Sequence, residues 1–206
     1  MTGDQRTGEG GGADCAPRAG KYARVERERR FLLAAPPPAA LVVATRRITD
    51  RYLTGTRLRL RRVEHLESGE RQEKLTQKIP ADRSGPVQGL ITNTYLSRAE
   101  YDLLATLPAA VLRKTRLSIP PLGVDVFDPP LHGLVLAEAE FDTDEAARSF
   151  RPPPQSIAEV TDDPRFTGGG LVRADRDQLR GWLAEYGIDA DADAYPDADS
   201  TLRAGG

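Results

Sequence analysis

The sequence predicts an α+β fold made mainly of antiparallel strands, arranged as a barrel or a sandwich with a few flanking helices. Segments in which polar and apolar residues alternate with a period of two recur along the chain, as is typical of strands. Turn residues separate these segments at short intervals, which favours antiparallel neighbours. Several segments carry charge on one face and apolar or small residues on the other. Whether the charged faces point toward the interior or toward solvent decides between a barrel and a sandwich.

Length and charge limit the organisation of the chain and its partners. At 206 residues we expect one folded domain at 21–188, a disordered leader at 1–20 and a disordered acidic tail at 189–206. The net charge of −2 combines basic and acidic segments, which argues against broad nucleic-acid binding. No apolar run approaches the roughly 20 residues of a membrane span. We expect a cytoplasmic protein, because no signal peptide is visible and the single Cys15 fits a reducing compartment.

Breakers and caps define the expected elements in order. Pro36-Pro37-Pro38 ends the first strand and starts a short helix, and Thr54-Gly55 turns the second strand into the third. Residues 67–70 form a hairpin loop, and Ser97 with Glu100 forms a capping box at the start of a helix. The expected strands are 22–33, 46–53, 56–65, 71–79, 89–96, 111–119, 122–127 and 132–141. The expected helices are 39–44, 98–106, 144–150 and 175–186, with an irregular segment at 156–170.

The first strand carries two carboxylates and a guanidinium on one face. With a period of two, Glu26, Glu28 and Arg30 point to the same side, where a strand that only packs on a core would place apolar residues. Two acids at positions i and i+2 can bind one divalent cation, because hard cations such as Mg²⁺ prefer oxygen ligands. A solvated edge strand and the first turn of a charged helix are the alternatives on this stretch alone.

Later strands repeat the charged face. Each of them alone is typical of a solvated sheet surface, but together they indicate a shared cavity if their apolar faces pack outward. About ten charges cannot occupy a dry core, since burying an ion costs several kcal/mol unless it is well paired. We therefore expect a wet cavity or one that holds a polyphosphate bridged by Mg²⁺ or Mn²⁺, because Arg and Lys both bind phosphate. The charged faces contain Arg57, Arg59, Arg61, Lys74, Lys78, Lys114, Arg116, Asp125, Glu138 and Glu140.

The motif Glu26-x-Glu28-x-Arg30 resembles the E-x-E-x-K signature of the CYTH superfamily, the triphosphate tunnel metalloenzymes. The resemblance spans roughly residues 22–186 and implies an eight-stranded antiparallel barrel that forms a charged tunnel. The further matching motifs, in chain order, are Asp50-x-Tyr52-Leu53, the Arg57/Arg59/Arg61 run, Leu75-Thr76-x-Lys78, Arg113-Lys114-x-Arg116, Val124-Asp125-Val126-Phe127, Gly133-Leu134 with Glu138-x-Glu140, and Val160-Thr161-Asp162-Asp163.

The same resemblance implies a site for a small-molecule triphosphate and two metal ions, Mg²⁺ or Mn²⁺. One metal would orient and neutralise the phosphate chain, and the other would activate a water molecule. The implied catalytic residues are Glu28, Arg30 and Lys78. The implied metal ligands are Glu26, Glu28, Asp125, Glu138 and Glu140. The implied triphosphate ligands are Arg57, Arg59, Arg61, Lys74, Lys78, Lys114 and Arg116.

Two features depart from the family pattern. Arg30 replaces the signature lysine, and it keeps the charge but lacks the compact ammonium group. Many members carry Arg-x-Glu-x-Glu on the strand after the equivalent of Lys78, whereas residues 91–96 contain no acid. We expect the hydroxyls of Thr92 and Thr94 to serve there instead, and the metals to be held differently or turnover to be slower.

Several other residues have simpler interpretations. Tyr52 is expected in the core, with a place in the tunnel as the alternative, and Trp182 is expected to pack. His65 and His132 are expected at the surface, because neither has a second His or Cys at metal spacing. Residues 168–170 are three glycines without the lysine of a P-loop, so they predict a turn. The expected core aromatic residues are Phe127, Phe141 and Phe150.

The favoured function is therefore a metal-dependent hydrolase of triphosphates that releases phosphate. Inorganic tripolyphosphate is the preferred substrate, because no constellation that would read a nucleobase is visible. The alternatives are an adenylate cyclase, a thiamine or nucleoside triphosphatase, and a non-catalytic polyphosphate-binding module. A charged interaction surface without a cavity is a further alternative. The protein is expected to be a monomer or a homodimer, without nucleic-acid or membrane partners.

Overall fold

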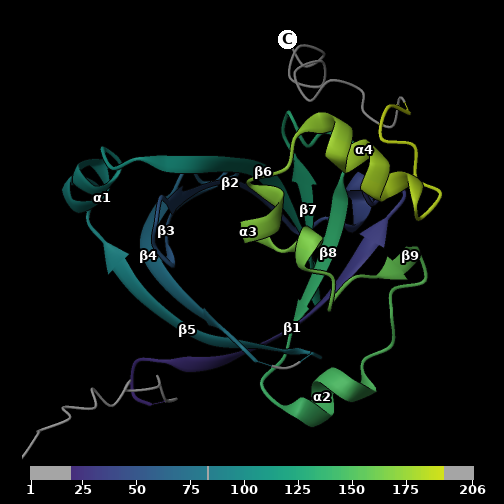
Figure 1. Cartoon of the computed structure of the whole chain (residues 1–206), viewed down its shortest axis with the longest axis horizontal. Helices are drawn as coiled ribbons and strands as arrows, with labels where there is room; N and C mark the ends of the chain where they lie inside the picture. The colour runs from purple at the N-terminus through teal and green to yellow at the C-terminus, as the bar shows by residue number, and fades with distance from the viewer. Residues whose placement is uncertain (1–19, 83, 193–206) are drawn as a thin grey trace, which may run out of the picture.

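Eight antiparallel strands close into a barrel in the computed structural model, which describes residues 20–82 and 84–192. The neighbours run in the order β5-β4-β3-β2-β6-β7-β8-β1, and the pairing of β5 with β1 closes the ring (Figure 1). The predicted eight-stranded antiparallel barrel with flanking helices is confirmed. Its strands are β1 (Arg24–Leu33), β2 (Ala44–Leu53), β3 (Leu58–His65), β4 (Arg71–Pro80), β5 (Val87–Leu96), β6 (Ala109–Ile119), β7 (Leu122–Phe127) and β8 (Val135–Glu140).

The predicted leader and tail fall on residues that the structure mostly does not describe. Of these two segments only Gly20 and residues 189–192 lie within the described part, and Cys15 lies outside it. The three-part division of the chain therefore stays a prediction. None of the helices in the described ranges has the length and the hydropathy that a membrane-spanning helix needs.

Gly89 allows the barrel to close. On β5 it lies opposite Pro80 of β4 and opposite Glu26 of β1, so one residue borders both neighbouring strands. Its φ is +133°, and a Cβ atom there would lie 2.0 Å from the carbonyl oxygen of Ile79. Only glycine combines that backbone angle with so close an approach. The pairing of β5 with both β4 and β1 at Gly89 places Glu26 at the inner wall of the barrel.

Residues 156–170 contain one strand and two short helices, so the prediction of an irregular segment was wrong for most of this range. β9 (Ser156–Glu159) pairs with the end of β1 outside the ring, and it is followed by the 3₁₀ helix η2 (Pro164–Phe166) and the short helix α3 (Gly168–Leu171). The turn predicted at residues 168–170 is the start of α3, where the Thr167 hydroxyl accepts a hydrogen bond from the Gly170 amide. Glycine disfavours helix, so tertiary packing and this cap decide the conformation.

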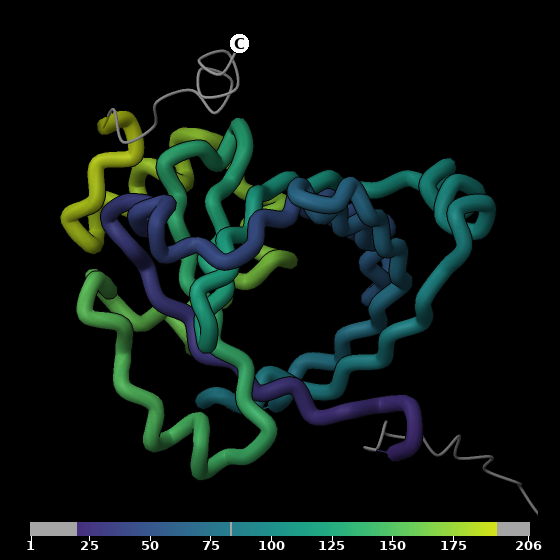
Figure 2. The backbone as a smooth tube through the Cα atoms, turned by 180° about the vertical axis from the view of Figure 1, so that it is seen from behind, coloured from purple at the N-terminus to yellow at the C-terminus, as the bar shows by residue number. Residues whose placement is uncertain are grey.

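The other helices lie where the sequence predicts them, with shifted ends. The capping box of Ser97 and Glu100 is confirmed, and the helix predicted at 39–44 is only one 3₁₀ turn. α1 lies on the opposite side of the barrel from α4 in both Figure 1 and Figure 2. The helices are η1 (Ala39–Leu41), α1 (Arg98–Leu104), α2 (Asp144–Ser149) and α4 (Arg176–Ala184).

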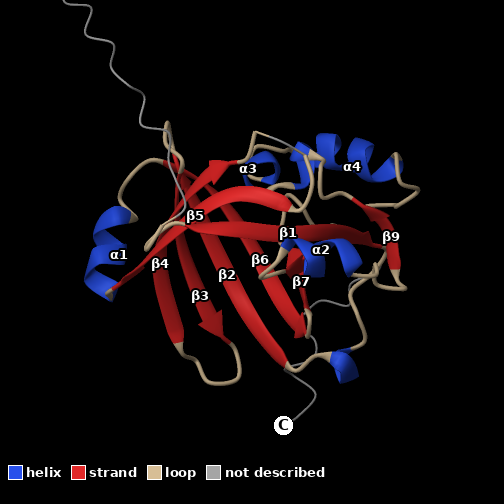
Figure 3. Ribbon diagram, turned by 90° about the horizontal axis from the view of Figure 1, so that it is seen from below, coloured by secondary structure: helices blue, strands red, loops and turns tan. Residues whose placement is uncertain are grey.

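One apolar cluster lies on the outer face of the barrel, as expected. It joins β1, β7 and β8 to the half-buried Phe150 at the end of α2, and Figure 3 shows α2 beside β1. Phe141 is half-buried as well and contacts Phe150, so neither ring is fully in the core. The buried members of this cluster are Phe31, Leu33, Val124, Val135 and Ala137.

A larger apolar cluster lies at one end of the barrel interior. Leu32, Leu112 and Leu136 occupy the same strand faces as the predicted site charges, and the buried Phe127 lies beside them. The cap, which we define as residues 164–190 with η2, α3 and α4, packs against them through Phe166 and Leu171, among others. Trp182 packs against Phe166, as predicted. The inward faces are therefore charged along one part of the bore and apolar where the cap covers it.

Candidate functional site: a two-walled cavity

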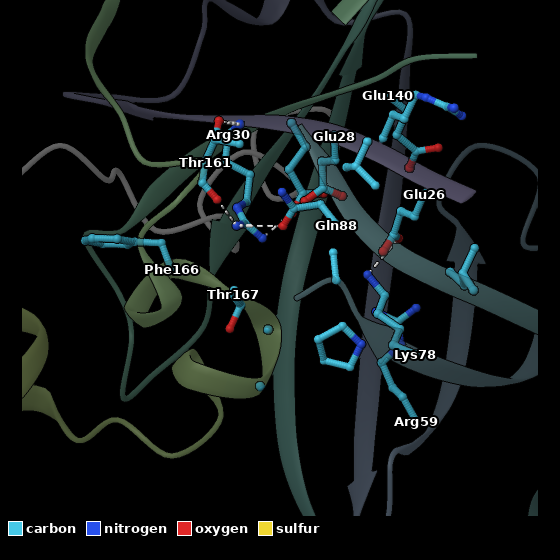
Figure 4. Close-up of a pocket in the computed structure, with 18 of the residues that line it drawn as sticks. Glu26, Glu28, Arg30, Arg59, Lys78, Gln88, Glu140, Thr161, Phe166 and Thr167 are labelled. Atoms are coloured by element: carbon cyan, nitrogen blue, oxygen red, sulfur yellow. Dashed lines mark hydrogen bonds and ion pairs between the residues drawn. The ribbon is translucent and has the colours of Figure 1, made fainter. Parts of the chain in front are cut away.

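The barrel encloses a cavity of about 1280 Å³, and all but one of the predicted site residues line it. Period-two alternation on neighbouring strands turns these side chains to the inside. Figure 4 shows Glu26, Glu28, Arg59, Lys78 and Glu140 around this space. The lining members of the predicted set are Glu26, Glu28, Arg30, Arg57, Arg59, Arg61, Lys74, Lys78, Lys114, Arg116, Glu138 and Glu140.

β1 and β8 supply an acidic wall. These strands pair so that Glu28 lies opposite Glu140, and Arg30 lies opposite Glu138. Glu28 is only 6% exposed, and burial together with the nearby Glu138 raises its pKa to about 7. As the side chains stand, no three His, Cys, Asp or Glu side chains within the described ranges lie close enough to hold a metal ion.

β3, β4 and β6 supply a basic wall on the other side of the barrel. Burial, reinforced by Arg61 and Arg59, lowers the pKa of Lys74 to about 8, because like charges disfavour the ammonium form. Lys78 extends to the acidic wall, where its Nζ lies 2.7 Å from Oε1 of Glu26. Lys78 and Glu26 therefore form an ion pair that links the basic wall to the acidic wall.

Asp125 is covered by the basic side chains of β6 and does not line the cavity. It is fully buried, and it accepts hydrogen bonds from Lys114 and, at 2.7 Å, from Nε of Arg116. Arg116 also donates to Glu138. Burial would raise the pKa of Glu138, but Lys114 and Arg116 hold it well below its usual range. Asp125 thus orients the basic wall in the state described.

Asp50 supports the site, and the sequence interpretation named it only as part of a matching motif, without a role. It is 1% exposed, and it accepts two hydrogen bonds of 2.6 Å from Arg61 while Arg59 lies at 3.6 Å. Burial favours its protonated form, yet Arg61 and Arg59 hold its pKa well below the usual range. The alternation along β2 contains the signal, since Ile48, Asp50 and Tyr52 share one face.

On β5 the inward face is not the one predicted. Asn93 and Ile91 line the cavity, and Asn93 lies opposite Thr76, whose hydroxyl donates to it at 2.7 Å. Thr92 and Thr94 lie opposite residues of the outward face of β4, so they cannot donate hydroxyls to the tunnel. The prediction that Thr92 and Thr94 face the tunnel was wrong. The inward positions are one residue away, and a shift of one residue along a strand moves a side chain to the opposite face.

Arg30, the residue in place of the signature lysine, is held by protein groups. Its guanidinium donates to Glu28 at 3.4 Å, to Gln88 at 3.1 Å and to the carbonyl oxygen of Thr161 (Figure 4). Gln88 and Thr161 also line the cavity. The sequence interpretation missed both roles, because one residue starts a strand and the other follows a short strand that was not predicted.

Tyr52 was expected either in the core or in the tunnel, and it does both, because it packs against the apolar cluster and lines the cavity. Burial and the negative charge of Asp50 raise its pKa to about 12. Its hydroxyl lies against α3, where a Cβ atom added at Gly168 would be only 2.0 Å away. His132 is exposed, as expected, whereas His65 is half-buried at the end of β3.

Changing Gly168 to Ala should destabilise the fold, because the added methyl group meets the Tyr52 hydroxyl in a packed interior. We expect a loss of about 1–3 kcal/mol in the free energy of unfolding, measured by urea denaturation. Tyr52→Phe in the same chain should restore part of that loss, because it removes the obstructing oxygen. Gly169→Ala is the matched control, since no atom lies within 4 Å of a Cβ at that position. An equal loss in both single variants would contradict this contact.

This chain is similar to several proteins of known structure. No model of a known protein family and no curated protein matches the chain. The inorganic triphosphatase NE1496 shares 25% identity over 73% of this chain and 96% of its own, with a TM-score of 0.48. PH1819 from Pyrococcus horikoshii shares 14% identity over 80% and 92%, at a TM-score of 0.43. A proposed adenylate cyclase from Vibrio parahaemolyticus shares 11% identity over 87% and 99%, at 0.34.

The architecture of this chain is the one that the sequence resemblance implied. Its barrel has eight antiparallel strands, and its charged residues face inward in the order of the CYTH motifs. The CYTH resemblance holds at the level of the fold. In this CYTH-like barrel the four glutamates of the predicted site lie on β1 and β8, and its bases, apart from Arg30 on β1 and Arg57 just before β3, lie on β3, β4 and β6.

Proposed function

We propose that this protein is a metal-dependent hydrolase of triphosphates, with inorganic tripolyphosphate as its preferred substrate. The observation that carries the proposal is the arrangement of one cavity with carboxylates on one wall and arginines and lysines on the other. A phosphate chain with several negative charges complements the basic wall, and a divalent cation complements the acidic wall. Neither wall alone would distinguish a triphosphate from a simple anion.

The basic wall supports binding of the phosphate chain. Nε of Arg59 is buried and makes no hydrogen bond within the described ranges, and its ion pair with Oδ1 of Asp50 is long at 3.6 Å, so the guanidinium would bind a phosphate oxygen as a further partner. Arg57 lies exposed at the rim of the cavity. Lys78 would exchange its contact with Glu26 for the phosphate chain, which frees that carboxylate. Each exchange replaces an internal ion pair with a charge-assisted hydrogen bond to substrate.

The acidic wall supports a metal site. Glu26, Glu28, Glu138 and Glu140 would hold Mg²⁺ or Mn²⁺, and the raised pKa of Glu28 fits this assignment, because burial and crowding with Glu138 disfavour its charge until a cation is near. When bound, such a cation polarises phosphoryl oxygens and lowers the pKa of water. Glu28 would accept the proton of the attacking water, and Lys78 would neutralise charge on the terminal phosphate.

The preference for an inorganic substrate rests on the aromatic side chains of the cavity. A nucleobase is commonly held by stacking on an exposed aromatic face. Phe127 and Phe166 are 4% and 0% exposed because they pack between barrel and cap, and Tyr52 packs against Gly168. These three rings therefore offer no free face to a base, and Phe141, the half-buried fourth aromatic residue of the described lining, packs edge-on against Phe150.

A phosphate-release assay tests the proposal. Purified protein with Mg²⁺ or Mn²⁺ is given tripolyphosphate, ATP and thiamine triphosphate in separate reactions. We expect phosphate from tripolyphosphate at the highest kcat/KM. Release of pyrophosphate with a cyclic nucleotide from ATP would instead identify a cyclase, and faster hydrolysis of ATP or thiamine triphosphate would reassign the substrate.

A non-catalytic polyphosphate-binding module is the second candidate. It is favoured by β5, where Ile91 and Asn93 occupy inward positions and offer no carboxylate to a metal. Tight calorimetric binding of tripolyphosphate without phosphate release, with either metal, would establish this function and rule out the hydrolase.

Gly123 provides a test of the basic wall. It lies opposite Glu138, and Arg116 crosses over it, with Cδ at 3.2 Å from the position of a Cβ atom. Gly123→Val should displace Arg116 and weaken tripolyphosphate binding about tenfold, as expected for one charge-assisted contact. Calorimetric titration measures the Kd. Gly181→Ala in α4, where a Cβ meets no atom within 4 Å, is the control. An unchanged Kd for Gly123→Val would remove Arg116 from the binding site.

A further inference from the structure

Arg30 joins three separate segments of the cavity wall. Its side chain is buried, with 5% of the residue exposed. One end of the guanidinium, Nη1, donates to Glu28 on the same strand. The other end, Nη2, donates both to Gln88 at the start of β5 and to the carbonyl oxygen of Thr161, in the linker that leads from β9 to the cap. These segments are far apart in the sequence and meet at one side chain.

The two outer segments are also joined to one another and to β1. The backbone amide of Gly85 donates to Asp162, and Gln88 donates back to the carbonyl oxygen of Gly85 at 2.9 Å. The Arg30 amide donates to the Thr161 hydroxyl at 3.1 Å, and the Val160 amide donates to the Arg30 carbonyl oxygen at 2.8 Å. Arg30 is therefore the common member of a connected set of hydrogen bonds.

Only an arginine can make this set of contacts. A guanidinium is planar and presents five donors in a rigid fork, so its two ends reach acceptors on different segments. An ammonium group is one point of charge on a flexible stem. A lysine at this position would keep a positive charge near Glu28 but would leave Gln88 or the Thr161 carbonyl oxygen without its donor. The change from the signature lysine thus adds a mechanical link.

We propose that Arg30 is a positioning residue, which fixes Glu28, residues 84–88 at the entry to β5 and the linker at 160–163 relative to one another. This inference rests on the proposed function, because it assigns to Glu28 the chemical step that Arg30 supports. Arg30 does not bind the phosphate chain. Its loss should therefore lower kcat and leave KM nearly unchanged, because the substrate-binding bases on β3 and β6 keep their own partners.

Direct contact with substrate is the alternative role. Nε of Arg30 is buried and has no hydrogen-bond partner within the described ranges, so in this role it would donate to a phosphate oxygen. In that case loss of the guanidinium would raise KM and weaken binding of tripolyphosphate. A simple electrostatic role would differ again, because a lysine would preserve it.

The test compares Arg30→Lys with Arg51→Lys. Arg51 is a matched control, because its Nη2 donates to backbone carbonyl oxygens of Ala105 and Leu107 on the outer side of the barrel. For Arg30→Lys we expect kcat to fall about tenfold or more at a KM within about twofold, as for loss of a hydrogen bond to a charged group. For Arg51→Lys we expect both constants to stay within about twofold.

Hydrogen exchange of the ligand-free variants provides a readout that does not depend on activity. The amides of Gly85 and Val160 donate to groups within the connected set, and the amide of Glu28 donates to the carbonyl oxygen of Pro86 in the loop before β5. In Arg30→Lys these amides should exchange about tenfold faster than in the wild type, while amides in β2, β3 and β6 stay protected. A uniform rise over all strands would mean loss of overall stability and would overturn the proposal.

The remaining outcomes also test the positioning role of Arg30. Unchanged exchange and unchanged kcat in Arg30→Lys would show that charge alone matters, and a raised KM at constant kcat would show direct contact with the phosphate chain. Either result overturns the positioning role. If the wild type releases no phosphate from any substrate, the hydrolase proposal fails by itself. Faster local exchange in Arg30→Lys would then still show the link between the three segments.

Discussion

Glu28→Gln should abolish phosphate release from tripolyphosphate, with a fall in kcat of about 10²–10⁴-fold, the usual contribution of a general base. The amide keeps the shape of the side chain but can neither accept the proton nor contribute negative charge to a cation. Binding of tripolyphosphate without metal should persist, because it depends on the basic wall. Release of phosphate against substrate concentration, with Mg²⁺ and with Mn²⁺, measures the effect.

Glu64→Gln is the control for this variant. Glu64 lies on the outer face of β3 and pairs with Arg71 at 2.9 Å, so the same chemical change is made outside the cavity. Its kcat should match that of the wild type. If Glu28→Gln retained more than about a tenth of the wild-type kcat, Glu28 would not be the base.

Glu28→Gln should stabilise the ligand-free protein. The pKa of Glu28 is raised from its ordinary 4.5 to about 7, mainly by burial and by Glu138, so the folded state keeps a proton that the unfolded chain releases. Stability therefore falls as the pH rises from 4.5 to 7, and the penalty is complete above pH 7. At pH 8 without cations, Glu28→Gln should unfold with a free energy about 1–3 kcal/mol larger than the wild type. A lower value, measured by urea denaturation, would contradict this account.

Asp50→Asn should destabilise the protein by about 3–5 kcal/mol, because it leaves the buried Arg61 without its charged partner. For a chain of this length that corresponds to a fall in Tm of roughly 10 °C or more, which calorimetry measures. Arg61 and Arg59 hold the pKa of Asp50 below its usual range, so its contribution is present at neutral pH and is lost as the pH falls below 3.8. The difference between variant and wild type should therefore shrink in acid.

Two comparisons test this explanation. Asp102→Asn, which affects exposed pairs with Arg98 and Arg62, should change the stability by less than about 1 kcal/mol. Tripolyphosphate should raise the Tm of Asp50→Asn more than that of the wild type, since the anion supplies the missing negative charge. An equal rise in both proteins would mean that Arg59 and Arg61 do not contact the phosphate chain.

Strand patterns made much of the site predictable. In β8 the glutamates alternate with alanines, and in β1 they alternate with arginines, so period two alone groups Glu26 with Glu28, and Glu138 with Glu140, on one face of their strand. On β5 the same reasoning was out of register by one residue. No charge marked the inward face, so the threonines were assigned to the side that Asn93 occupies.

Other parts were not predictable because they depend on contacts between distant segments. Gly168 starts a helix although glycine disfavours helix, and it does so where α3 packs against Tyr52. Arg30 was recognised as a departure that keeps the charge of the signature lysine without its ammonium group, but only the folded chain brings Gln88 and Thr161 to its guanidinium. Asp125 was an expected metal ligand, yet it lies covered beneath Lys114 and Arg116.

The resemblance of its motifs to the CYTH superfamily implied the closed eight-stranded barrel, while the sequence by itself determined most of the strands and the face of most strands that carries charge. It could do so because alternation is a local property, and because so many ions cannot be buried without partners or ligands. Only the tertiary structure decided which ions pair, which carboxylate has a raised pKa, and where the cap closes the bore. These properties depend on burial and on distances of a few ångströms between side chains far apart in the chain, which no local pattern encodes.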